Sequence, residues 1–143
     1  MGISVIDLFK VGLGPSSSHT MGPMRSVRQF LEECSVKVLR KTTHFKISLY
    51  GSLALTGRGH GICGALILGA MGYKPDQIDP EEAALSILKV KSDQQLFLLK
   101  KFQLYFDFKK DIVFHYKEFL PYHANGMIFE LFDNSAKLLK SAT

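Results

Sequence analysis

Apolar residues recur along the first third of this chain with the period of a helix. At spacings of three and four, the apolar positions are Met24, Val27, Leu31, Cys34 and Val38. This stripe predicts one amphipathic helix over residues 23–39, with Pro23 favourable in its first turn. Cys34 lies on the apolar side of that helix, which indicates a small packing residue and not a metal ligand.

The middle of the chain predicts a strand followed by two helices. Residues 45–50 alternate between apolar and polar, as a half-buried strand does. Residues 62–71 are apolar on nearly every face and predict a buried helix that stops at Gly72. The run Asp79-Pro80-Glu81-Glu82 combines a capping residue, a first-turn proline and two carboxylates, so a helix to about residue 89 is expected.

The last third of the chain alternates in four segments, which predict two antiparallel hairpins. Residues 102–108 and 112–116 form the first pair, separated by a short charged turn. Residues 127–132 and 136–141 form the second. The chain is therefore expected to have an α+β fold of two layers, with helices packed on a mainly antiparallel sheet.

Composition narrows the class of protein. The 143 residues, 46% of them hydrophobic, are enough for one domain whose core, with 11 Phe and no Trp, is built on phenylalanine. The net charge of +5 comes from scattered basic residues, which argues against nucleic-acid binding. The longest apolar run is too short to span a membrane, and no signal peptide is expected. Two cysteines make no disulfide framework, so a cytoplasmic location is expected.

The segment 12–24, GLGPSSSHTMGPM, concentrates small polar and titratable side chains before a predicted helix. Hydroxyls, backbone N–H groups and an imidazole at a helix entrance suit a small anionic ligand. A polar loop with serine N-caps is the plainer alternative that these residues alone leave open.

Three stretches taken in order resemble the β domain, or β subunit, of the iron–sulfur L-serine dehydratases. They are VGLGPSSSHTMGPM at 11–24, YGSLALTGRGH at 50–60 and LPYHANGM at 120–127. The resemblance implies that residues 1–143 are a single β domain, similar in fold to the allosteric substrate-binding domain of some phosphoglycerate dehydrogenases. It also implies a lyase of amino-acid metabolism, linked to gluconeogenesis, that converts L-serine to pyruvate and ammonia and is a homodimer.

The resemblance further implies a four-iron, four-sulfur cluster (4Fe-4S) as cofactor. Such a cluster needs several cysteine thiolates, and this chain has only Cys34 and Cys63. The cluster is therefore expected in a partner α domain or subunit that this chain lacks, and no metal ligand is expected here.

The resemblance assigns roles to residues in the three motifs. His60 is the expected general base, which takes the α-proton of serine. The substrate carboxylate and amino group would be bound by Ser16, Ser17, Ser18, His19 and Thr20. His123 and Asn125 would line the opposite wall of the same cleft. The other two histidines, His44 and His115, are expected to be surface or structural residues.

One departure from the family pattern favours a second interpretation. Relatives commonly have Thr-Asp two residues after the motif histidine, where this chain has Ile62 and Cys63. The change removes a helix cap and a possible partner for the base. A non-catalytic regulatory domain that binds serine or a small anion is therefore the alternative function. A scaffold that only docks a partner is a weaker third possibility.

Overall fold

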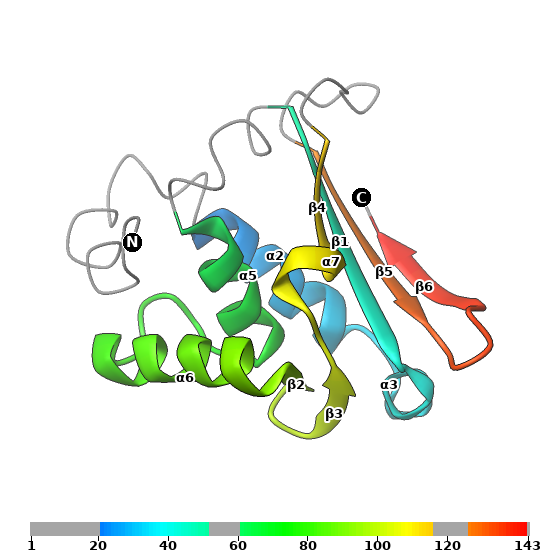
Figure 1. Cartoon of the computed structure of the whole chain (residues 1–143), viewed down its shortest axis with the longest axis horizontal. Coiled ribbons are helices and arrows are strands. Elements are labelled where there is room, and N and C mark those ends of the chain that lie inside the picture. The colour runs from blue at the N-terminus through cyan, green and yellow to red at the C-terminus, as the bar shows by residue number, and fades with distance from the viewer. Residues whose placement is uncertain (1–20, 52–60, 116–125, 143) are drawn as a thin grey trace.

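The computed structural model describes residues 21–51, 61–115 and 126–142. The helices in these ranges are α2 (Met21–Glu32), α3 (Val36–Lys41), α5 (Ile62–Ala70), α6 (Pro80–Asp93) and α7 (Phe108–Asp111). The strands are β1 (His44–Tyr50), β2 (Gln95–Leu98), β3 (Phe102–Tyr105), β4 (Ile112–His115), β5 (Met127–Phe132) and β6 (Leu138–Ala142). The predicted α+β class is confirmed, with helices gathered on one side of the main sheet (Figure 1).

The main sheet is mixed, with strand order β4-β1-β5-β6. β4 runs parallel to β1, whereas the β1–β5 and β5–β6 pairs are antiparallel. The β5–β6 hairpin is the second of the two predicted hairpins and is confirmed. β2 and β3 form a separate antiparallel pair.

The first predicted hairpin, of residues 102–108 with 112–116, is wrong. β3 pairs with β2, a strand that the alternation did not reveal, and β4 pairs with β1. Between β3 and β4 the chain makes the short helix α7, because Asp107 caps it by accepting the Lys109 N–H at 2.8 Å. That helical turn carries β4 away from β3 and over to the edge of the main sheet.

The predicted single helix over 23–39 is also corrected, since α2 and α3 are separate. Ser35 ends the continuity because its Oγ accepts the Val38 N–H at 3.2 Å and so starts a new helix as an N-cap. The apolar stripe itself is right, since Met24, Val27 and Leu31 are buried. Pro23 lies in the first turn of α2, as predicted.

Phenylalanine builds the core between the sheet and the helices, as the composition predicts. On β1, Phe45 and its inward neighbours Ile47 and Leu49 are fully buried. The ring of Phe30 from α2 lies 6.4 Å from that of Phe45 and 5.4 Å from that of Phe129 on β5. These contacts join the first helix to two central strands.

Helices α5 and α6 confirm the two predictions made for the middle of the chain. α5 is buried along almost its whole length and packs against α2. α6 begins at Pro80 and continues four residues past the predicted end at 89, to Asp93.

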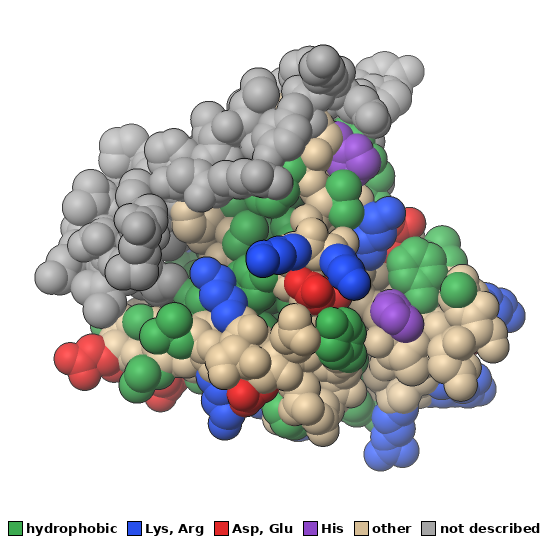
Figure 2. All heavy atoms as spheres, in the orientation of Figure 1, with side chains coloured by type: hydrophobic (Ala, Val, Ile, Leu, Met, Phe, Trp, Pro, Cys, Tyr) green, Lys and Arg blue, Asp and Glu red, His purple; other side chains and the backbone are tan. Residues whose placement is uncertain are grey.

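The outer surface carries mixed charge. On the face shown in Figure 2, basic side chains lie among acidic and uncharged ones and form no continuous patch. The helices in the described ranges are too short or too polar to cross a lipid bilayer.

Candidate active-site edge

The residues that the motifs single out as site residues all lie outside the described ranges. They are Ser16, Ser17, Ser18, His19, Thr20, His60, His123 and Asn125. The structure does describe the chain positions that flank these residues on β1, α5, β4 and β5. The candidate site is therefore built from those flanking positions.

Two of the three motif segments adjoin one edge of the main sheet. β1 and β4 are parallel and in register up to Tyr50 and His115, so both strands end at the same edge. β5 is antiparallel to β1 and begins at this edge, where the Tyr50 N–H donates to the Gly126 carbonyl at 2.9 Å. Residues 52–60 therefore follow the end of β1, and residues 116–125 connect the end of β4 to the beginning of β5. These strand ends lie side by side (Figure 1).

An aromatic pair marks this edge of the sheet. The rings of Tyr50 and His115 stack with 4.2 Å between their centroids and 3° between their planes. Both side chains are half-buried, and the Nε2 atom of His115 is shielded from solvent. The two strand ends are thus in contact through side chains as well as backbone.

The helix that follows His60 in the chain begins without a side-chain cap. Gly61 occupies the N-cap position of α5 in the left-handed conformation, with φ of 71°. Ile62 is fully buried, and Cys63 is half-buried against the core. Ile62, one of the two residues expected to depart from the family pattern, therefore contributes apolar packing to the core.

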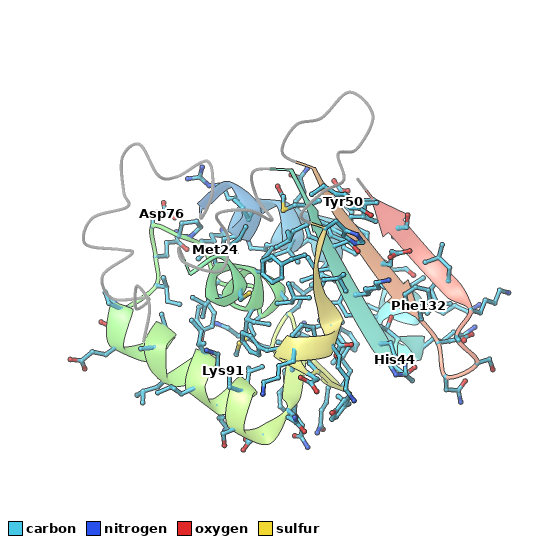
Figure 3. The ribbon with its side chains drawn as sticks, turned by 45° about the horizontal axis from the view of Figure 1, so that its top comes forward. Met24, His44, Tyr50, Asp76, Lys91 and Phe132 are labelled. Atoms are coloured by element: carbon cyan, nitrogen blue, oxygen red, sulfur yellow. The ribbon has the colours of Figure 1, made fainter. Side chains whose placement is uncertain are left out.

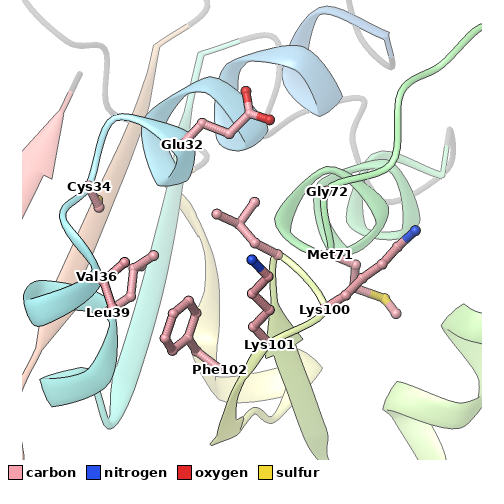
Figure 4. A pocket seen from close by; sticks show the side chains of 10 residues that line it. Glu32, Cys34, Val36, Leu39, Met71, Gly72, Lys100, Lys101 and Phe102 are labelled. Carbon is pink, nitrogen blue, oxygen red and sulfur yellow. The ribbon is translucent and has the colours of Figure 1, made fainter.

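A shallow concavity of about 410 Å³ lies elsewhere, between α2, α3 and the β2–β3 turn (Figure 4). Val36, Leu39 and Phe102 give it an apolar lining, with Lys100 and Lys101 at the turn. Its lining residues, among those that the structure describes, belong to none of the three motifs.

Cys34 also borders this concavity, and its thiol is engaged in the protein. Its Sγ–H donates to the Phe30 carbonyl at 3.2 Å, and burial raises the pKa of the thiol. A protonated, hydrogen-bonded thiol fits the packing role predicted for this residue. Among the residues that the structure describes, no group of three His, Cys, Asp or Glu side chains is placed to hold a metal ion.

Family membership follows from comparison with known proteins. The family model for the serine dehydratase beta chain matches residues 4–143, so the chain belongs to that family. It is 42% identical to the L-serine dehydratase of Streptomyces coelicolor over 134 residues and 41% identical to that of Haemophilus influenzae over 135 residues. It is 39% identical to the L-serine dehydratase TdcG of Escherichia coli over 139 residues.

These alignments cover 93%, 93% and 96% of this chain but only 30% of each relative. The chain therefore spans less than a third of the length of the curated relatives it matches. The names of these relatives describe proteins of their full length.

The motifs alone did not identify the Tyr50–His115 pair. Tyr50 opens the second motif, but His115 lies outside all three and was expected to be surface or structural. The pair depends on the parallel β1–β4 register, which alternation cannot reveal because parallel and antiparallel strands share the same two-residue period.

Proposed function

We propose that this chain is the β part of an L-serine dehydratase, which converts L-serine to pyruvate and ammonia. The family membership supports this reaction, because the similar proteins named above are L-serine dehydratases. The observation that carries the site is the parallel pairing of β1 with β4. That pairing gives the segments holding His60 and His123 neighbouring starting points at one sheet edge.

In the proposed reaction, His60 takes the proton from the α-carbon of serine as the β-hydroxyl departs. A histidine suits this step because the ordinary imidazole pKa, about 6.5, leaves a neutral base available near pH 7. The substrate carboxylate and amino group are assigned to Ser16, Ser17, Ser18, His19 and Thr20. His123 and Asn125 form the opposite wall of the cleft.

The residues of this chain do not fit an iron–sulfur cluster. Cys34 and Cys63 are the two cysteines of the sequence, fewer than the thiolates that such a cluster requires. The engaged thiol of Cys34 makes it a poor ligand as well. We therefore assign the 4Fe-4S cluster to a partner α domain or subunit. We also propose that the assembled enzyme is a cytoplasmic homodimer.

Assembly with a cluster-bearing α part tests this proposal. The isolated chain, treated anaerobically with iron and sulfide, is expected to take up no stoichiometric cluster and to form no pyruvate from L-serine. The assembled enzyme is expected to form both pyruvate and ammonia. Stoichiometric cluster uptake by this chain alone contradicts the division of roles, and an inactive assembled enzyme with an intact cluster contradicts the function.

Substitutions in the first motif separate substrate binding from chemistry. Ser17→Ala and His19→Ala remove groups assigned to the carboxylate in both the ground state and the transition state, so the apparent KM should rise more than kcat falls. Steady-state kinetics with L-serine measures both. A pure loss of kcat at constant KM places these residues in the chemical step instead.

The start of α5 favours a second candidate, a regulatory domain that binds serine or a small anion. Gly61 gives the helix no side-chain cap. Ile62 and Cys63 stand where the family resemblance implies a hydroxyl and a carboxylate, one of which could orient the base. Isothermal titration of the assembled enzyme with L-serine discriminates the two functions. Binding without turnover, in a preparation with a complete cluster, supports the regulatory function.

A further inference from the structure

The stacked rings of Tyr50 and His115 have no role in the reaction proposed above. They lie where β1 and β4 end, on the last register pair of the parallel strands. We propose that this stack is a positioning element, which fixes the spacing between the two strand ends from which segments 52–60 and 116–125 continue. The inference rests on the proposed function, because it requires that the reaction take place at this edge.

The backbone makes β1 the reference for this edge. On one side, Leu49 and Tyr50 pair with Phe114 and His115 of β4. On the other side, the Tyr50 N–H donates to Gly126, immediately before β5. A displacement of β4 relative to β1 therefore moves the beginning of segment 116–125 relative to Gly126, the residue that follows this segment. It also moves that beginning relative to the start of segment 52–60.

β4 has few other strand contacts to hold it in register. It is four residues long and is an outermost strand of the main sheet, with β1 as its strand neighbour. Contacts between side chains on neighbouring strands help to hold those strands together. The stack on Tyr50 therefore holds His115, the last residue of β4, from which segment 116–125 continues.

The stack lies on the face of β1 opposite to the core. Phe45, Ile47 and Leu49 point to the buried side, and Tyr50 alternates with them. Replacing the Tyr50 ring therefore opens no cavity among these core residues. A loss of activity on its replacement is then separable from a loss of folding.

Catalytic groups that are misplaced by about 1 Å can lose about 10²-fold in rate. Tyr50→Leu and His115→Leu, made in the assembled enzyme, should each lower kcat for L-serine about 10- to 100-fold, with a smaller rise in KM. The double variant should lose little more than the worse single variant, because both changes remove one contact. Tyr50→Phe keeps the ring and should stay within about twofold of the wild-type kcat.

Phe132→Leu is the matched control. Phe132 ends β5 opposite His44, at the far end of the sheet from Tyr50 (Figure 3). This change removes a half-buried ring from a strand end without touching the proposed edge, so kcat should be unchanged. Thermal unfolding of every variant, measured in parallel, shows that the enzymes compared are folded at the assay temperature.

The inference is overturned if Tyr50→Leu retains the wild-type kcat, or if the two single losses are simply additive. It is also overturned if Tyr50→Phe is as slow as Tyr50→Leu, since the hydroxyl and not the stack is then responsible. Should a leucine variant not assemble, His115→Phe should retain turnover and His115→Gln should lose it, and the reverse order contradicts the stack. A wild-type enzyme without pyruvate formation refutes the proposed function instead.

Discussion

Helices α5 and α6 begin in opposite ways, although only nine residues separate them. α6 starts from local sequence, since the Asp79 carboxylate accepts the Glu82 N–H at 3.0 Å and Pro80 occupies the first turn. α5 starts from Gly61 without a side-chain cap, and every residue of this helix except the half-buried Cys63 is buried. The position of α5 is therefore set by packing and not by its own first residues.

This difference bears on the proposed base, because His60 immediately precedes the helix that has no local start signal. The backbone at Gly61 is held in place by what α5 packs against. The core then supports the candidate active-site edge, whereas the start of α6 does not. Changes to the packing of α5 and to the cap of α6 should therefore differ both in the property of the enzyme that they affect and in the size of the effect.

Gly69→Ala should give the largest loss of stability. A Cβ at this position of α5 would collide with the Met24 carbonyl oxygen and would lie 2.5 Å from Val27 Cγ1 on α2. Overpacking against backbone should cost on the order of 2 kcal/mol in the free energy of unfolding, despite the roughly 1 kcal/mol that alanine gains in helix propensity. Urea unfolding of the assembled enzyme measures the change.

Gly72→Ala is the control for the Gly69 variant. Gly72 has a φ of +95°, but a Cβ there would lie at an ordinary 3.6 Å from the nearest atoms, those of Leu99. Its cost should be conformational, about 1 kcal/mol, and smaller than that of Gly69→Ala. If Gly69→Ala is neutral, α5 does not depend on its close contact with α2.

Asp79→Ala should destabilise α6 by about 1 kcal/mol, because one N–H of the first turn loses its acceptor. Asp79→Asn and Asp79→Ser keep an acceptor and should recover most of that loss. Thermal unfolding and L-serine turnover should be measured together. A fall in kcat for a folded Asp79→Ala enzyme removes the contrast between the two helices.

Asp111→Asn should have the smallest effect, and one that depends on pH. Burial raises the pKa of Asp111, whose Oδ2 accepts the Asp107 N–H at 2.7 Å. A folded-state pKa above the unfolded value favours folding at pH below the unfolded pKa, and this contribution is lost as pH rises through the folded pKa. Asparagine keeps an acceptor without a charge, so stability near pH 7 should rise slightly and its dependence on acidic pH should flatten.

Denaturant titrations of Asp111→Asn and wild type between about pH 3 and 7 measure this difference. A lower stability of Asp111→Asn at pH 7 means that the ionised carboxylate stabilises the folded state, which contradicts a pKa raised by burial.

Elements with strong local signals were the ones that the sequence predicted well. The capped start of α6, the continuously apolar α5 and the β5–β6 hairpin are each specified within one short segment. The split between α2 and α3 was missed because Cys34 and Val38 continue the apolar period across the break at Ser35. In this chain, the polar cap at Ser35 overrides a hydrophobic period that continues past it.

Pairing between distant segments was where prediction from sequence failed. Residues 112–115 alternate as a strand should, but nothing in that alternation selects β1 over β3 as the partner. The motif residues, in contrast, were identified by resemblance without any knowledge of the fold. Their roles stay predictions, because the described residues include parts of the three motifs but none of the assigned site residues.

The most direct test of the central claim is the steady-state turnover of His60→Ala in the assembled, cluster-loaded enzyme. His44→Ala is the matched control, since His44 is exposed at the opposite end of β1 (Figure 3). Loss of a general base should lower kcat for L-serine by about 10²–10⁴-fold, with KM changed much less.

A general base must be unprotonated, so the wild-type rate should fall as pH drops below a histidine pKa, ordinarily about 6.5. We predict that His60→Ala loses both turnover and this acidic limb while His44→Ala keeps both. Wild-type turnover in His60→Ala, or survival of the acidic limb, would contradict it and move the base to another residue, with His123 the next candidate.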